Sequence, residues 1–337
     1  MSCFKRLITF PGQGSVVDIQ SIKFTSKKIQ SYIVSSDFRD YWDYLLKNPN
    51  KPGTIVMLSR LLYQDAISSN FINTADKTLL LGHSLGELSC LTCGGNENLL
   101  KLSDVFEIAN FRNELMRKES QIFYNTINPH ALKNTGNVFE MRAMLITSSF
   151  LKKNNITDFL QTILLNEIKN YNNKSDNTAA ICVANINSPQ QLVLSGVSED
   201  IENFYSHNVS MLPRKYKILN NPDDIPFHNS KILARIQPPL YDFIWNKLRE
   251  NGTSSINYLN VPIVNNINGE ITYTKDEALE NFVKGSTNTV DFVKCCETIK
   301  KNISRDNSNE NISDSLDIIN IGPTQIINNL LLKNNLK

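Results

Sequence analysis

The residues with the clearest chemical signature form the hexapeptide Gly82–Glu87 (Gly-His-Ser-Leu-Gly-Glu), which directly follows the apolar run Leu79–Leu81. This is the G-x-S-x-G pattern, in which glycines two residues before and after a serine allow a sharp strand-to-helix turn. Such a turn presents the serine oxygen above the sheet, at the positive end of the following helix. We therefore predict that Ser84 is the nucleophile of an acyl-transfer enzyme, with hydrolysis as the default reaction.

A serine hydroxyl needs a base to remove its proton, and the chain has only four histidines. His83 adjoins the serine, and its expected role is to prop the turn or to contact a substrate carbonyl. His130 lies in a polar stretch and His207 follows a surface helix, so both are expected to be exposed. His228 lies in the segment Asp224–Asn229, just before a helix, and the order serine then histidine is that of α/β-hydrolases. We predict His228 as the base.

The group that orients the base is left open by the sequence. Asp223 and Asp224 are too close to His228 in the chain to reach behind its ring easily. A backbone carbonyl could accept the second ring N–H instead, which would make the pair a dyad rather than a triad.

Acyl transfer also needs hydrogen-bond donors for the developing oxyanion. The backbone amide of Leu85, directly after the serine, is one candidate. The loop Gly12–Gly14 after the first predicted strand could supply the second, from the backbone or side-chain amide of Gln13. The alternative, that this glycine pair only forms a turn, stays open.

Arg112 lies in the middle of a predicted helix. Its guanidinium could bind a substrate carboxylate through two parallel hydrogen bonds. Residue chemistry alone favours the alternative, an exposed helix arginine paired with a nearby carboxylate.

Composition limits the class of protein. The chain has 337 residues, 41% hydrophobic residues and a formal net charge of +2, which suits a globular enzyme and provides no basic footprint for nucleic acid. The apolar runs are far shorter than the ~20 residues that span a bilayer, so no membrane partner is expected. Cys90 and Cys93 lack a second pair at zinc-ligand spacing. We expect them to be core residues, Cys295 and Cys296 to be free thiols, and no metal or cofactor.

Strands and helices alternate along most of the chain, which favours an α/β fold with a mostly parallel sheet. The apolar pattern predicts strands at 7–10, 78–81, 261–265 and 318–321, and helices at 26–34, 38–46, 53–69, 85–93, 103–118, 231–251 (with breaks near Pro238 and Pro239), 276–283 and 290–302. Polar stretches at 123–137 and 305–314 are expected to be a linker and a loop. Between them, the order strand, helix, strand, strand, helix, strand indicates a ferredoxin-like module. We predict a hydrolase-like large domain at 1–137 and 219–337 and an inserted ferredoxin-like subdomain at 138–218.

These residues together resemble a known family. The motifs Phe10–Ser15, Gly82–Glu87, Arg112 and Pro226–His228 are spaced as in the malonyl-CoA:acyl-carrier-protein transacylases, and the resemblance covers essentially the whole chain. Asn185–Gln190 and Val261–Asn266 are similar to further family blocks. The stretches Ala109–Met116, Ile225–Ser230 and Pro239–Trp245 resemble the stand-alone mitochondrial members in particular.

The resemblance implies roles for the candidate residues. Ser84 would carry the malonyl group, with His228 as its base and later its acid. Gln13 and the Leu85 amide would form the oxyanion hole, and Arg112 would bind the free carboxylate of malonyl, which reverses the preference stated above.

One family feature is absent from the chain. In the family a backbone carbonyl, often that of a glutamine, orients the histidine. The corresponding stretch here is Val283–Ser286, without the glutamine, so Gly285 or a neighbour is expected to supply the carbonyl.

The resemblance also implies partners and location. Malonyl would pass from malonyl-CoA to the phosphopantetheine thiol of acyl carrier protein by a ping-pong route, for type II fatty acid synthesis in the mitochondrial matrix, in an enzyme expected to be a monomer. The amino terminus shows no apolar signal stretch or presequence, so this location rests on the resemblance alone. The alternatives are a serine esterase or thioesterase with water as acceptor, and a catalytically idle carrier-protein scaffold.

Overall fold

A computed structural model describes residues 4–14, 17–73, 77–95, 99–129, 137–147, 149–150, 159–174, 178–303, 316–324 and 326–336. The chain divides into two compact units. The first unit consists of Met1–Phe111, Leu240–Phe282 and Lys294–Lys337, and the second of Arg112–Pro239 and Val283–Val293. These units are defined by packing. The domain boundaries inferred from the sequence, with an insertion at 138–218, stay a prediction.

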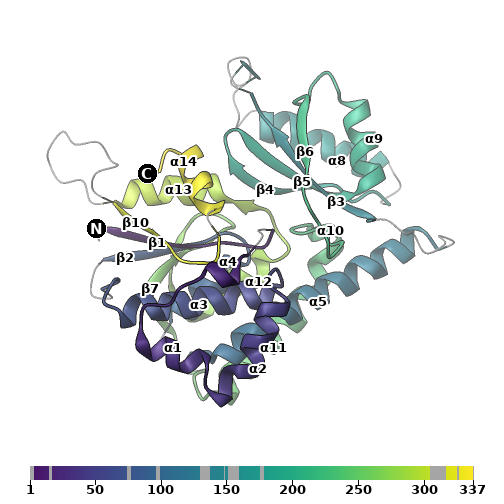
Figure 1. The fold of residues 1–337 in the computed structure, drawn as a ribbon. Helices are drawn as coiled ribbons and strands as arrows, with labels where there is room; N and C mark the ends of the chain where they lie inside the picture. The colour runs from purple at the N-terminus through teal and green to yellow at the C-terminus, as the bar shows by residue number, and fades with distance from the viewer. Residues whose placement is uncertain are drawn as a thin grey trace, which may run out of the picture. The chain divides into compact units, whose positions relative to one another are not determined.

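The first unit contains a five-stranded sheet in the order β10-β1-β2-β7-β8 (Figure 1). The strands are β1 (Arg6–Phe10), β2 (Thr78–Gly82), β7 (Tyr258–Val264), β8 (Ile271–Thr274) and β10 (Asp317–Asn320). The neighbours β10/β1, β1/β2 and β2/β7 are parallel, and β8 is antiparallel to β7. The predicted α/β fold with a mostly parallel sheet is confirmed, although β8 was not expected.

Helices surround this sheet within the first unit. They are α1 (Lys27–Ile33), α2 (Ser36–Lys47), α3 (Pro52–Ser68), α4 (Gly86–Gly94), α13 (Phe292–Asn302), α14 (Ile326–Lys333), the beginning of α5 (Leu102–Ile127) and most of α11 (Gln237–Glu250) and α12 (Lys275–Gly285). α4 packs on β1, β2 and β7 and against α3, and it is buried along its whole length. Cys90 and Cys93 are therefore core residues, as predicted, and both are free thiols.

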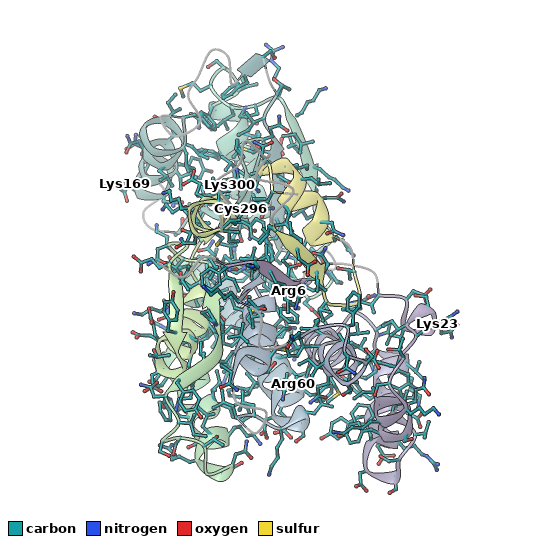
Figure 2. All side chains as sticks on the ribbon, turned by 90° about the vertical axis from the view of Figure 1, so that its left-hand side faces the viewer. Arg6, Lys23, Arg60, Lys169, Cys296 and Lys300 are labelled. Carbon is teal, nitrogen blue, oxygen red and sulfur yellow. The ribbon has the colours of Figure 1, made fainter. Side chains whose placement is uncertain are left out.

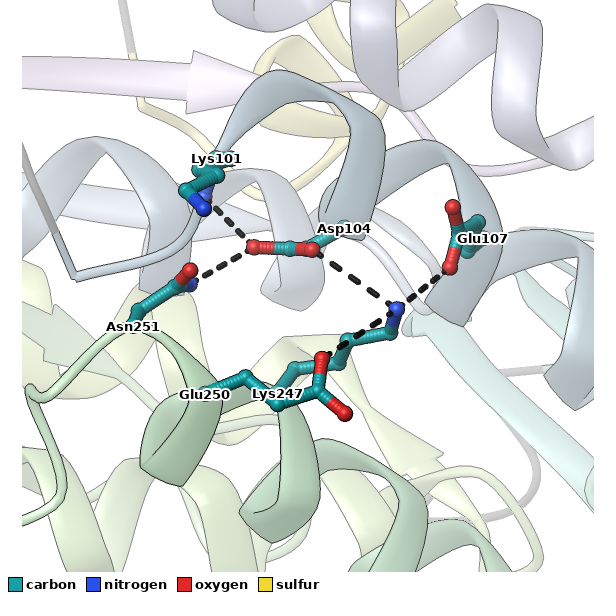
Figure 3. A network of polar contacts seen from close by, with 6 residues as sticks. All are labelled: Lys101, Asp104, Glu107, Lys247, Glu250 and Asn251. Carbon is teal, nitrogen blue, oxygen red and sulfur yellow. Dashed lines mark hydrogen bonds and ion pairs between the residues drawn. The ribbon is translucent and has the colours of Figure 1, made fainter.

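Polar side-chain contacts link neighbouring elements of the first unit. Arg6, at the start of β1 (Figure 2), donates from Nε to a carboxylate oxygen of Asp317 in β10 at 2.7 Å. Where α5 begins, Asp104 accepts from the backbone N–H of Lys101 at 2.8 Å and from the side chain of Asn251 at 2.7 Å (Figure 3). The ammonium of Lys247 on α11 lies 2.6 Å from a carboxylate oxygen of Glu107.

The second unit contains a sheet in the order β6-β3-β5-β4-β9. Its strands are β3 (Phe139–Leu145), β4 (Cys182–Ser188), β5 (Gln191–Val197), β6 (Lys215–Ile218) and β9 (Val290–Asp291). β3, β5, β4 and β6 pair antiparallel, and β9 is parallel to β4. With α8 (Leu165–Lys174) after β3 and α9 (Ser198–His207) before β6, the chain follows the order β-α-β-β-α-β, consistent with the predicted ferredoxin-like module.

Both faces of this second sheet are covered. One face packs with α8, α9 and a π-helical turn at Phe159–Leu164, around a core that includes Met144, Leu194 and Phe204. The other face packs on the segment that carries α10 (Ser230–Leu233) and on α5, through residues such as Met116 and Phe139.

Two expectations about element ends were wrong. The polar stretch that begins at residue 123 is not a linker at its start, because α5 continues to Ile127. Its residues Phe123, Tyr124 and Ile127 pack against the core of the second unit, and the exposed polar side chains between them hide this apolar face in the sequence. The helix expected from 290 begins at Phe292, since Val290 and Asp291 form β9.

The helix expected at 231–251, with breaks near Pro238 and Pro239, is divided in the structure: α10 ends at Leu233 and α11 begins at Gln237. Pro238 and Pro239 lie at the beginning of α11, where the missing proline N–H costs little. Residues 130–136 and the loop expected at 305–314 lie outside the described residues. Within the described part of the chain, no helix is both long enough and apolar enough to cross a membrane.

Candidate active site

Ser84 lies in the sharp connection between β2 and α4, in the first unit. Its φ angle is +53°, a left-handed backbone conformation that L-residues other than Asn, Asp and Gly rarely adopt. A methyl group on Gly82 would come within 2.1 Å of the backbone of Gly86, and one on Gly86 within 2.4 Å of the Phe10 carbonyl oxygen. Both motif glycines are therefore required by direct backbone contacts of this serine turn (residues 82–87).

The backbone amides of the serine turn are almost all engaged. Ser84 N–H donates to the side-chain oxygen of Asn266 at 2.7 Å. The amides of Gly86 and Glu87 donate to the carbonyls of His83 and Ser84 at 3.0 and 2.9 Å. Among the hydrogen bonds of the described residues, none uses the N–H of Leu85, the amide predicted to contact the oxyanion.

The loop after β1 lies against the serine turn. His83 N–H donates to the carbonyl of Phe10 at 3.0 Å, and a methyl group on Gly12 would come within 2.4 Å of the His83 carbonyl oxygen. Gln13, the next residue, is half-buried. The structure therefore brings Gln13, His83, Ser84 and Leu85 into one region of the first unit, at the carboxyl ends of β1 and β2.

His228 lies in the second unit, and its ring is oriented by backbone carbonyls. Its Nδ1 is 2.8 Å from the carbonyl oxygen of Gly285 and 3.1 Å from that of Asn288. A carbonyl oxygen can only accept, so Nδ1 carries a proton, and in the neutral form of the ring Nε2 is the nitrogen with the lone pair. This is the state a general base requires. The expected carbonyl at Gly285 is present, without the family glutamine.

The main chain around His228 is also fixed. His228 has a φ of +60° and is almost fully buried. Its carbonyl accepts from the thiol of Cys182 at 3.4 Å, and burial raises the pKa of that thiol to about 12, so the thiol stays protonated. Asn229 donates from its side chain to the carbonyls of Ala180 and Ser195 at 2.7 and 3.2 Å.

The nearby aspartates have other partners. Asp224 accepts from the backbone N–H groups of Val138 and Phe139 at the beginning of β3. Asp223 accepts from the side-chain amide of Asn113 at 3.2 Å. These contacts agree with the expectation that neither aspartate orients His228.

Arg112 is buried in α5 and is only 1% exposed. Its Nε donates to the hydroxyl of Ser286 at 2.8 Å. The alternative of an exposed helix arginine is therefore wrong. The short stretch Gly285–Asn288, which we call the support loop, contacts both His228 and Arg112 within the second unit.

Of the other histidines, His207 is placed away from the role of base. His207 is exposed at the end of α9, where its Nδ1 lies 2.7 Å from the carbonyl of Asn203. His130 lies outside the described residues. The described residues also contain no group of three or more His, Cys, Asp or Glu side chains that could hold a metal ion.

Two residues that contact the candidate site residues were not predicted from the sequence. Asn266 bonds to the serine turn and Ser286 bonds to Arg112. Asn266 had one signal, because it ends a block that resembles the family. Ser286 lies in the stretch expected to supply a carbonyl to His228, but nothing in the sequence predicted that its hydroxyl would contact Arg112.

The two groups of candidate residues belong to different compact units. Gln13, His83, Ser84 and Leu85 lie in the first unit, and Arg112, His228 and Gly285 in the second.

No model of a known protein family matches the chain. Curated proteins do match. The chain is 37% identical to the mitochondrial malonyl-CoA–acyl carrier protein transacylase of Saccharomyces cerevisiae, over 98% of this chain and 92% of that protein. It is 24% identical to the malonyl-CoA–acyl carrier protein transacylase of Buchnera aphidicola, over 96% of this chain and 91% of that protein.

Solved structures of similar fold also cover nearly the whole chain. The malonyl-CoA:acyl carrier protein transacylase of Helicobacter pylori matches with a TM-score of 0.65 and 16% identity, over 99% of this chain and 93% of that one. An acyl carrier protein S-malonyltransferase from Vibrio cholerae matches with a TM-score of 0.66 and 16% identity, over 98% and 94%. At these identities the likeness shows a shared fold.

Proposed function

The chain belongs to the malonyl-CoA:acyl-carrier-protein transacylase family, and from this premise we propose that it transfers malonyl from CoA to the thiol of acyl carrier protein through a malonyl ester on Ser84. The resemblance to the mitochondrial yeast relative places this activity in the mitochondrial matrix, where it supplies fatty acid synthesis. We propose a monomer as the working state, which sedimentation analysis would test.

In the first half-reaction the Ser84 hydroxyl attacks the thioester carbonyl of malonyl-CoA. Nε2 of His228 takes the hydroxyl proton as the C–O bond forms, and the negative charge on the carbonyl oxygen is stabilised by Leu85 N–H and Gln13. Collapse of this intermediate breaks the C–S bond, and His228 returns its proton to the CoA sulfur. A malonyl-serine ester and free CoA result.

In the second half-reaction the carrier-protein thiol is the nucleophile. His228 takes the thiol proton, the sulfur attacks the ester carbonyl, and the bond to the serine oxygen breaks as His228 returns the proton to it. Arg112 binds the carboxylate of the malonyl group in both halves. Its guanidinium is held at Nε by Ser286, and a guanidinium is suited to a bidentate contact with a carboxylate.

The observation that best supports this mechanism is the hydrogen-bond pattern at His228. Two carbonyl acceptors fix the proton on Nδ1, so the opposite nitrogen can accept and return a proton at each step. Both half-reactions need such an exchange, because the serine or thiol is deprotonated as it attacks and the leaving sulfur or oxygen is protonated as it departs.

The test is to incubate the protein with malonyl-CoA, measure its intact mass and map the modified residue. We expect one malonyl group on Ser84, none on the Ser84→Ala variant, and rapid loss of the group only when the thiol form of acyl carrier protein is added. Rapid loss in water alone would instead indicate an esterase. Malonyl on another residue would refute the assignment of the nucleophile.

A second measurement tests the substrate class. Malonyl differs from acetyl by one carboxylate, so Arg112→Ala should weaken acylation by malonyl-CoA about 10²-fold or more, and acylation by acetyl-CoA far less. Equal losses for both substrates would exclude a carboxylate-binding role.

A further inference from the structure

The turn after β7 contributes one side chain to the serine turn of the same unit. Asn266 is completely buried. Its Oδ1 accepts from Ser84 N–H at 2.7 Å, and its Nδ2 donates to the carbonyl of Gly82 at 2.7 Å. Its own backbone N–H donates to a carboxylate oxygen of Glu87 at 2.7 Å. One residue therefore bonds to the serine turn at three points.

The orientation of the Asn266 amide is determined by its partners. Ser84 N–H can only donate and the Gly82 carbonyl can only accept. Rotating the amide by 180° would oppose two donors on one side and two acceptors on the other, so the assigned orientation is the only one that satisfies both. The side chain acts as a bridge between the peptide groups on either side of His83.

This bridge lies where the backbone needs support. Ser84 adopts a φ of +53°, which is unfavourable for a serine and persists only where the surroundings impose it. The two bonds of Asn266 fix the carbonyl of Gly82 and the amide of Ser84, one on each side of His83. The buried carboxylate of Glu87 in turn holds the backbone of Asn266, so the bridge is itself anchored to the first turn of α4.

The bridge also determines which amide of the turn is available to an oxyanion. The N–H groups of Gly86 and Glu87 donate to carbonyls of the turn itself. Asn266 engages the N–H of Ser84. Leu85 N–H is thereby the amide of the turn that no acceptor among the described residues engages.

We propose that Asn266, anchored by Glu87, is a positioning residue that fixes the Ser84 backbone and leaves Leu85 N–H as the turn's oxyanion donor. The inference rests on the proposed function, in which Ser84 is acylated. Asn266 acts through the backbone of the serine turn. Its loss is expected to lower the rate of acylation and to leave substrate affinity nearly unchanged.

The test compares two buried asparagines in the full-length protein. Asn172 makes the same kind of bridge, from its side-chain amide to the N–H and the carbonyl of Ile181, and it belongs to the second unit, whereas the serine turn belongs to the first. We expect Asn266→Ala to slow single-turnover malonylation of Ser84 about 10²-fold, with KM for malonyl-CoA within about twofold of wild type. Asn172→Ala should keep the wild-type rate at a similar loss of melting temperature.

An isosteric variant covers the case in which Asn266→Ala does not fold. Asn266→Asp fills the same volume and can accept from Ser84 N–H, but it cannot donate to the Gly82 carbonyl, so we expect malonylation to slow about tenfold or more. Wild-type kcat in either folded variant, or an equal loss in Asn172→Ala, would overturn the proposal. Failure of the proposed function would be distinguishable, because the wild-type protein itself would then carry no malonyl on Ser84.

Discussion

The serine turn and the segment around His228 both hold a functional residue in a left-handed backbone conformation, but by different means. At Ser84, with φ +53°, the support comes from side chains, the amide of Asn266 and the carboxylate of Glu87. At His228, with φ +60°, the ring is held by main-chain carbonyls of Gly285 and Asn288. The strain of such a conformation is about 1–3 kcal/mol.

The difference shows which positions depend on residue identity. A main-chain carbonyl remains available as an acceptor when the side chain of its residue is changed. A glycine can therefore occupy the position at which the family often has a glutamine. The bridge made by the Asn266 side chain is lost when that residue is substituted, because its amide supplies both the donor and the acceptor at the correct separation. We therefore expect substitutions near Ser84 to be more damaging than substitutions of equal size in the support loop.

The largest effect is expected from His228→Ala. Without the base, acylation of Ser84 should slow by about 10³-fold or more, since general acid–base catalysis contributes to both half-reactions. Stopped-time measurement of malonyl-enzyme by intact mass would show this. The matched control is His207→Ala, which removes an exposed histidine of the same unit. If both variants retain activity, the base has been misassigned.

Gly82→Ala should test the steric part of the serine turn. Its new methyl group would lie 2.1 Å from the backbone of Gly86, so the turn must shift, at a cost of about 1–3 kcal/mol in stability. We expect kcat to fall about tenfold or more, because the Ser84 oxygen moves with the turn.

Gly252→Ala is the control for this change. Gly252 has a φ of +70° but no atom within 4 Å of its added methyl group, so only conformational strain of about 1 kcal/mol is expected. Thermal unfolding and kcat would be measured for both variants. Equal loss of activity in the two would mean that the backbone contacts of Gly82 do not matter.

The sequence predicts the serine turn well because its signal is local. An apolar strand, the glycine pair and the following helix lie within a few residues, so Ser84 and Leu85 can be placed before the structure is known. The parallel sheet follows from the alternation of strands and helices in the same way. Short elements such as β8 and β9 are missed, since four-residue and two-residue strands carry too little periodicity.

The supports of the site are harder to predict for a physical reason. The Gly285 carbonyl that orients His228 is a main-chain group, and every residue type has one, so the sequence does not show which residue supplies it. Asn266 is separated from Ser84 by 182 positions in the chain. Residue chemistry alone favoured an exposed Arg112, because the residues of its own helix give no indication that the distant Ser286 hydroxyl accepts its Nε–H.

Ser286→Ala tests side-chain support against main-chain support within the support loop. Ser286 contacts Arg112 through its side-chain hydroxyl, whereas Gly285 and Asn288 contact His228 through their carbonyls. Loss of the acceptor for Arg112 Nε should loosen the guanidinium and raise KM for malonyl-CoA about tenfold, with little change for acetyl-CoA. Ser120→Ala removes another buried hydroxyl from the same unit, one that donates to the Met116 carbonyl of its own helix, and should change KM for neither acyl-CoA. A parallel loss with both acyl-CoAs would contradict the role of Ser286.

The smallest effect is expected from Lys247→Met, in the same unit as the serine turn. The ammonium of Lys247 lies 2.6 Å from Glu107, 3.7 Å from Glu250 and 3.9 Å from Asp104 (Figure 3). Because Glu107 and Glu250 are exposed and the buried Asp104 is the most distant of the three, the network should contribute about 1 kcal/mol or less, and less at high salt. Chemical unfolding would measure this loss, and kcat should not change.

The pH dependence of that loss has a definite sign. The hydrogen bond to Glu107 raises the pKa of Lys247 above its ordinary value of 10.5, so the folded state holds the proton more tightly than the unfolded chain. The stabilising effect is then fully present below pH 10.5 and disappears as the pH rises through the raised pKa. The difference in unfolding free energy between wild type and Lys247→Met should therefore be constant from pH 7 to about 9 and shrink above 10.5. If Lys247→Met instead lowered kcat as strongly as Asn266→Ala, the serine turn would respond to any loss of stability in its unit, and its amide bridge would have no special role.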